Sequence, residues 1–265
     1  MKRGVPVAVI LAALLLAGCV WALPRNITQP AGASFAVNYP GETQAAGKSA
    51  DNLFRPEKEA GTEDSSPRPK EVDTVFTWEP LPAEIRELIT GSSWREGSPV
   101  PPDRLAYLTL THHTLEGGAA QGHMIVHESL AKEVAEIFEE LYAAGYPIAN
   151  MQLVDDYGAD DDRSMEANNT YAFCHRDVAG KSTPSLHSYG VCIDINPWQN
   201  PYIRGGTAYP PQSRAYLDRG DVRPGMIVKG DACYNAFVSR GWTWGGHWSE
   251  PVDYQHFEKS LDALA

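Results

Sequence analysis

The pattern of apolar positions along the chain predicts one long helix. Between Ser129 and Ala144, apolar residues recur at helical spacing, so that one side of the helix is formed by Leu130, Val134, Ile137, Phe138 and Leu141. Ser129 is a candidate N-cap, and Glu133 adds favourable negative charge to the first turn. This amphipathic pattern predicts a helix with one face packed on the core.

Alternation of apolar and polar residues predicts a strand from Tyr189 to Ile195. A period of two sends Val191, Ile193 and Ile195 to one face and places Gly190, Cys192 and Asp194 on the other. Further strand candidates are residues 107–111, 124–126 and 151–154. Because the elements do not form repeating βαβ units, we predict an α+β fold with a small central antiparallel sheet and flanking helices.

The first residues have the composition of an export signal. Two basic residues precede the apolar run Val7–Ala17, which is short for a bilayer-spanning helix. The stretch that ends at Cys19, Leu-Ala-Gly-Cys, resembles a bacterial lipobox, in which the cysteine is lipidated. A signal peptide cut after Ala22 and an uncleaved anchor are the alternatives. We therefore expect an extracytoplasmic protein that a lipid anchors to the cell membrane, or a secreted one if Cys19 is not lipidated.

Composition divides the chain into three parts. Residues 1–23 form the signal peptide, and residues 24–71, rich in Ala, Gly, Pro, Ser and Glu, form a flexible tether with too few aliphatic residues to order itself. Residues 72–265 are of the usual length for one domain, which we expect to be a monomer. The net charge of −12 and the lack of a basic stripe argue against nucleic acid as a partner.

The four cysteines fit an exported protein. If Cys19 carries lipid, an odd number remains in an oxidising compartment. Cys192 lies in the predicted strand Tyr189–Ile195, so we predict a disulfide between Cys174 and Cys233.

Two short segments carry the candidate chemistry. The first, residues 185–194, supplies His187 and Asp194, and the second, residues 253–258, supplies His256. Two imidazoles and one carboxylate, with a position left for water, are the usual composition of a catalytic zinc site, whereas structural zinc sites more often have four ligands rich in cysteine. A buried carboxylate in an apolar strand also needs a metal, an arginine or a proton as its partner.

Asp253 stands three residues before His256, where its carboxylate could take a proton from an attacking water. In a regular strand these two side chains would point in opposite directions, so we predict irregular backbone between Pro251 and His256. The complete pattern is that of a zinc hydrolase with its metal site on the face of the sheet.

These segments resemble the signature of the peptidase M15 family, which comprises zinc D-alanyl-D-alanine carboxypeptidases and related L-alanyl-D-glutamate endopeptidases. The pattern is a Ser-x-His followed by Gly and Asp in a strand, and later an acidic residue three positions before a His. Here it is formed by Ser185, His187, Gly190, Asp194, Asp253 and His256. The subgroup with Asp before the last His and an upstream Trp-Gly-Gly stretch, here Trp244–Gly246, is the most similar.

The resemblance implies one zinc ion held by His187, Asp194 and His256, with Asp253 as general base and then acid for the leaving amine. Glu258 is a rival base, or a group that orients a ligand. Arg176 is a candidate to bind a substrate carboxylate or the charge of the transition state, and Ser185 a candidate to bind substrate. His247 stands where an aspartate is more usual and is a candidate for a residue that contacts the ligands without binding the metal.

Cys192 stands where the family usually has a small residue such as alanine, and we interpret it as a packing residue near the zinc. Residues 160–162, three consecutive aspartates, are interpreted as a solvated turn and helix start.

The implied activity is cleavage of a peptidoglycan stem peptide, as a D-alanyl-D-alanine carboxypeptidase. The alternatives are an L-alanyl-D-glutamate endopeptidase, a zinc-containing wall-binding module without activity, and a purely structural metal. The module has no use for Asp253, and the missing fourth protein ligand disfavours the structural role.

Overall fold

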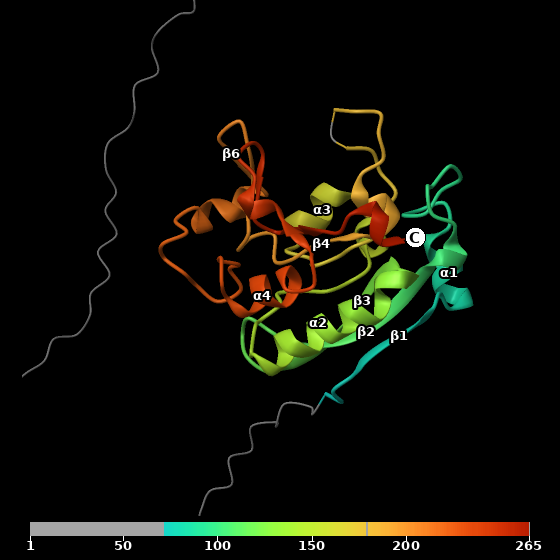
Figure 1. Ribbon diagram of the computed structural model, residues 1–265, viewed down its shortest axis with the longest axis horizontal. Coiled ribbons are helices and arrows are strands. Elements are labelled where there is room, and N and C mark those ends of the chain that lie inside the picture. Colours follow the sequence, from blue (N-terminus) through green and yellow to red (C-terminus); the bar gives the residue numbers. More distant parts are fainter. Residues whose placement is uncertain (1–71, 179, 265) are drawn as a thin grey trace, which may run out of the picture. The chain divides into compact units, whose positions relative to one another are not determined.

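The computed structural model describes residues 72–178 and 180–264. Its first layer is an antiparallel sheet in the order β1–β2–β3, formed by Phe76–Pro80, Leu105–His113 and Ala119–His127 (Figure 1). The predicted strands at 107–111 and 124–126 are therefore confirmed within β2 and β3, and both extend beyond their apolar stretches.

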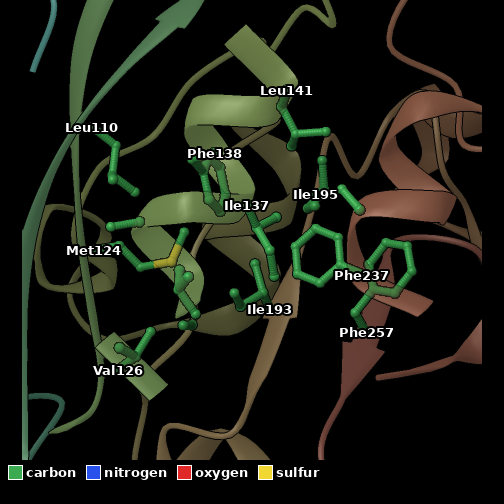
Figure 2. Close-up of a cluster of buried hydrophobic side chains, with 14 of the residues drawn as sticks. Leu110, Met124, Val126, Ile137, Phe138, Leu141, Ile193, Ile195, Phe237 and Phe257 are labelled. Carbon is green, nitrogen blue, oxygen red and sulfur yellow. The ribbon is translucent and has the colours of Figure 1, made fainter. Parts of the chain in front are cut away.

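Helix α2 (Ala131–Ala143) packs on one face of this sheet and lies at the centre of the core. Figure 2 shows its apolar side chains between those of the sheet, such as Leu110, and those of the later elements, such as Phe257. The predicted helix is confirmed, but Ser129 is not its N-cap. Leu130 takes that position, and Ser129 lies in a preceding 3₁₀ turn, where its hydroxyl contacts His127 Nδ1 at 2.8 Å.

The two faces of the sheet contact different clusters because successive strand residues alternate. Leu108 and Leu110 face α2, whereas Leu105 and Ile125 face a second cluster that includes Ile89 of helix α1 (Ala83–Ile89). The face toward α2 is thus apolar and buried, whereas the second cluster covers only part of the other face.

The remaining strands are short and form two further sheets. One has the order β4–β9–β7, formed by Cys192–Asp194, His256–Glu258 and Thr243–Trp244. The other has the order β6–β5–β8, formed by Thr207–Tyr209, Tyr202–Arg204 and Val252–Asp253. The predicted α+β class is confirmed, with three small antiparallel sheets in place of one central sheet.

Short helices connect these strands. The α-helices are α3 (Asp161–Glu166) and α4 (Ala232–Val238), and the 3₁₀ turns are η1 (Pro102–Arg104), η2 (Glu128–Leu130), η3 (Val154–Tyr157), η4 (Leu186–Tyr189), η5 (Pro211–Tyr216), η6 (Gly245–His247) and η7 (Leu261–Leu264). Within the described ranges, no helix has the length and apolarity that a membrane span requires.

Two strand predictions need correction. The strand predicted from Tyr189 begins only at Cys192, because η4 and a left-handed Gly190 precede it; its apolar face is as predicted, since Val191, Ile193 and Ile195 are fully buried. Residues 151–154 are not a strand. Met151 accepts one backbone hydrogen bond from His123, and the chain then enters η3.

The predicted disulfide between Cys174 and Cys233 is wrong. Both residues are free thiols, as is Cys192, and they are buried in separate apolar clusters. The signal peptide, the lipidation site Cys19 and the tether at 24–71 lie outside the described residues.

Candidate metal centre and cleft

The three predicted metal ligands meet at the ends of β4 and β9. Antiparallel pairing places Asp194 directly opposite His256, and η4 brings His187 beside them. One oxygen of the Asp194 carboxylate lies 2.7 Å from His256 Nδ1, and the other lies 3.1 Å from His187 Nε2. All three side chains are buried, and the structure brings Asp194 together with His256, which lies 62 positions further along the chain.

A tight turn positions His187. The hydroxyl of Ser185 accepts a hydrogen bond from the His187 amide at 3.4 Å, and Gly190 ends the turn with φ = 67°. A Cβ at position 190 would lie 2.6 Å from the His127 amide nitrogen, which donates to the Gly190 carbonyl. Glycine is therefore required twice, for its left-handed backbone and for the close approach to the end of β3.

Hydrogen bonds fix both imidazole rings. His187 Nδ1 donates to the Ala172 carbonyl at 2.5 Å, which leaves Nε2 directed at Asp194, and the Tyr171 ring stacks on the His187 ring at 4.9 Å. His256 Nε2 lies 3.3 Å from the Glu258 carboxylate, so Nδ1 is the nitrogen directed at Asp194. Such partners on the outer nitrogen are typical of histidines that bind metals.

Opposite charges stabilise the centre. Burial raises the pKa of the Asp194 carboxyl, but the imidazoles of His187 and His256 outweigh burial and hold that pKa well below its usual range. Burial likewise disfavours the charged form of His256, and the Asp194 carboxylate reverses this and raises its pKa to about 10. The site thus holds an ionised carboxylate that requires positive charge beside it.

Cys192 also belongs to this cluster. Its sulfur and one ring nitrogen each of His187 and His256 lie within 4.8 Å of one another, and all three residues are buried, so they form a group that could hold a metal ion. Burial raises the pKa of the Cys192 thiol. The sequence interpretation placed Cys192 on the face of Asp194 and near the zinc, as it is found, but only as a packing residue.

Asp253 lies in β8, close to the same centre, and is 9 % exposed. Its Oδ1 atom has no hydrogen-bond partner among the described residues. Burial raises the pKa of its carboxyl to about 7, with the nearby His256 opposing the shift. The prediction of irregular backbone from Pro251 to His256 is confirmed only in part: Val252–Asp253 form the strand β8, and the chain is irregular between it and the start of β9 at His256.

The three predicted ligands, Asp253 and Glu258 line a cleft of about 680 Å³. Its lining includes three cationic side chains, Arg176, Lys181 and Arg204. Arg176 forms an ion pair of 2.9 Å with Asp161, whose carboxylate also accepts a hydrogen bond from the Tyr171 hydroxyl.

The run of aspartates was only partly understood from sequence. Asp160 caps α3, as predicted, by accepting a hydrogen bond from the Arg163 amide. Asp161, the next residue, lines the cleft instead and forms an ion pair with Arg176, a role that no local sequence pattern indicates. His247 lies elsewhere, with its Nε2 3.1 Å from the Tyr234 hydroxyl and its ring edge-on to Trp244. It makes no contact with the three predicted ligands among the described residues.

The segment that contains these ligands also has a recognisable family pattern. Residues 179–259 match the family model of D-alanyl-D-alanine carboxypeptidase. This segment belongs to the peptidase M15 family. No curated protein and no solved structure matches the chain.

The peptidase M15 segment contains the metal centre and Asp253, but not the whole cleft. Arg176 and Asp161, which line the cleft, precede it, as do Tyr171, the sheet β1–β2–β3 and helix α2. The match to the family model confirms the predicted resemblance and implies that the segment belongs to a peptidase domain. M15 peptidases use zinc, and the buried group of His187, Cys192 and His256 could hold such an ion.

Proposed function

We propose that this protein is a zinc peptidase that removes the terminal D-alanine from peptidoglycan stem peptides. The observation that carries the proposal is the pair of buried carboxylates at one cleft: Asp194, held between two imidazoles, and Asp253, with one oxygen left unpaired. The first is suited to hold a cation and the second to move a proton.

The donor set fits zinc. His187 Nε2, His256 Nδ1 and an oxygen of Asp194 would hold it, because their outer partners, the Ala172 carbonyl and Glu258, direct these atoms to one point. When bound, zinc lowers the pKa of water and polarises a peptide carbonyl. Glu258 thereby has the role of orienting His256, in preference to that of the base.

Asp253 is the base in this proposal. Its carboxyl has a pKa of about 7, so the carboxylate can accept a proton from water near neutral pH and return it to the departing amine. Its unpaired Oδ1 is free to receive that proton. A module that only binds the cell wall would have no need for a buried carboxylate that is costly to ionise.

Arg176 supplies the reason to favour a terminal bond. Its guanidinium lines the cleft, and its Nε atom has no hydrogen-bond partner within the described part of the chain. Asp161 and Tyr171 fix the group in place. A planar guanidinium is suited to a free carboxylate, which a peptide ending in D-alanine presents. Ser185, also in the cleft wall, shapes the turn before His187.

We further propose that the enzyme acts outside the cytoplasm, with one catalytic domain at 72–265. The signal-like N-terminus, Cys19 in a lipobox and the polar stretch 24–71 support a lipid-anchored enzyme on a tether.

The test incubates the full-length protein, loaded with zinc, with a stem pentapeptide that ends in D-Ala-D-Ala, followed by mass spectrometry. Loss of one alanine is expected, and both chelation and Asp253→Asn should abolish it. A cut after the first L-alanine would replace the carboxypeptidase by the endopeptidase. An intact peptide, from protein verified to contain zinc, would contradict peptidase activity on this substrate and favour the wall-binding module.

A further inference from the structure

Four polar side chains project from one face of β4 and β9. Register pairs Cys192 with Glu258 and Asp194 with His256, and residues two apart in a strand share a face. Ile193 and Phe257, the residues between them, are fully buried in the apolar core. Cys192 is therefore on the metal side of the sheet, diagonally across from His256.

The contacts of Cys192 place its sulfur at the centre. It lies within 4.8 Å of the ring nitrogens of His187 and His256, it is fully buried, and it is a free cysteine. Within residues 72–178 and 180–264, no hydrogen bond satisfies its thiol. By contrast, the buried thiol of Cys174 lies 3.8 Å from the Ala159 carbonyl.

Sulfur is a preferred ligand for zinc. Cysteine and histidine are the commonest zinc ligands, and a nearby cation deprotonates a coordinating thiol outright. An alanine or serine at this position would give only the imidazoles and the carboxylate. Thiolate also shifts the preference of a site toward zinc and cadmium and away from magnesium and manganese.

We propose that Cys192 is a further protein ligand of the metal, beside His187 and His256, with which it forms a group that could hold an ion. With Asp194 also bound, water would reach the metal by expansion to five ligands, which zinc adopts in some catalytic sites. The inference rests on the metal site of the proposed function and changes its composition, from two nitrogens and an oxygen to a mixed set that includes sulfur. The alternative is a metal site in which the Cys192 side chain packs against its neighbours and does not bind the metal.

The first test uses cobalt as a spectroscopic substitute for zinc in the full-length protein. Wild-type protein is expected to show a sulfur-to-cobalt charge-transfer band in the near ultraviolet. Cys192→Ala should lose the band, and Cys233→Ala, which removes a buried thiol from α4, should keep it. Cobalt bound without the band, or a band that persists in Cys192→Ala, would overturn the inference while leaving the metal site intact. Failure to bind cobalt would overturn both.

The second test needs no variant, so it does not depend on the folding of Cys192→Ala. X-ray absorption of zinc-loaded wild-type protein is expected to contain a sulfur neighbour at about 2.3 Å, in addition to nitrogen and oxygen at about 2.0–2.2 Å. A spectrum fitted by nitrogen and oxygen alone would contradict the assignment of Cys192.

Discussion

The layer of β1, β2, β3 and α2 and the region around β4 and β9 are stabilised in different ways. The first has long elements whose interior is filled by aliphatic side chains such as Leu110 and Ile137. The second has strands of two or three residues, and fully buried polar side chains lie beside its apolar ones, as at Asn196 and Asn200. Regular elements provide the core, whereas irregular ones allow side chains from several segments to meet at the metal centre.

The largest expected effect lies in the second region. Asp253→Asn should lower kcat by about 10²–10⁴-fold, because the amide cannot accept the proton. The free energy of unfolding should not fall at neutral pH, since the substitution removes a carboxylate that is costly to ionise when buried. Steady-state kinetics and urea unfolding measure the two quantities.

The matched control for this variant is Asp221→Asn, at an exposed carboxylate beside Arg223. It should leave both quantities unchanged. An Asp253→Asn enzyme with wild-type kcat would remove Asp253 from the mechanism and direct attention to Glu258.

The next largest effect is expected in the first region. Leu110 of β2 is fully buried against α2, so Leu110→Ala should lower the free energy of unfolding by about 2–5 kcal/mol. The metal content of the folded protein should stay the same, because the cavity lies away from the ligands. Leu88→Ala, at a residue that is 48 % exposed on α1, is the control and should cost far less. Loss of the metal in folded Leu110→Ala protein would show that the two regions are not independent.

The pH dependence of activity should reflect Asp253. The carboxylate form is the active base, so kcat/KM should rise by about tenfold per pH unit toward a plateau, with the bend at or below pH 7 because a bound cation favours ionisation. A profile that falls through this range would contradict Asp253 as the base.

The contribution of Asp253 to the free energy of unfolding should fall with rising pH, opposite to the rise in kcat/KM. The pKa of Asp253 in the folded protein lies above its unfolded value of about 3.9. Its stabilising contribution to the free energy of unfolding is therefore fully present below about pH 3.9 and is lost as the pH rises toward 7. Denaturant unfolding of Asp253→Asn, which cannot titrate at this position, isolates the contribution from those of other groups.

The same contrast explains what the sequence could predict. The period of Leu130–Leu141 and the alternation of Val191–Ile195 directly reflect burial, so α2 and both faces of β4 were correct. Asp194 was found because a carboxylate in an apolar strand needs a partner, and His187 and His256 because they complete with it the usual ligand set of a catalytic zinc site. Asp161 was missed, because an aspartate at a helix start has the same local pattern whether its side chain faces solvent or a cleft.

Interactions across distant loops leave still less trace in the sequence. Nothing near Asn200 predicts that its side chain donates to the carbonyls of Ile195 and Gly225 and accepts from the amide of Ile227. The predicted disulfide failed for a related reason, since cysteine count says nothing about which cluster buries each thiol.

Asn200 gives the smallest of these effects and the sharpest comparison with Leu110. Asn200→Ala would leave the Ile195 carbonyl, next to Asp194, and the Ile227 amide buried and unpaired, so we expect the free energy of unfolding to fall by about 1–3 kcal/mol. The Gly225 carbonyl would keep two other donors, the Tyr146 hydroxyl and the Asn196 amide. Asn235→Ala, which removes one exposed hydrogen bond to Gly230, is the matched control and should cost less than the Asn200 variant. Unlike Leu110→Ala, the Asn200 variant should also weaken metal binding, because Ile195 directly follows Asp194. Equal metal affinity in the two variants, measured by competition with a chelator, would mean that the polar interior stabilises the fold without positioning the site.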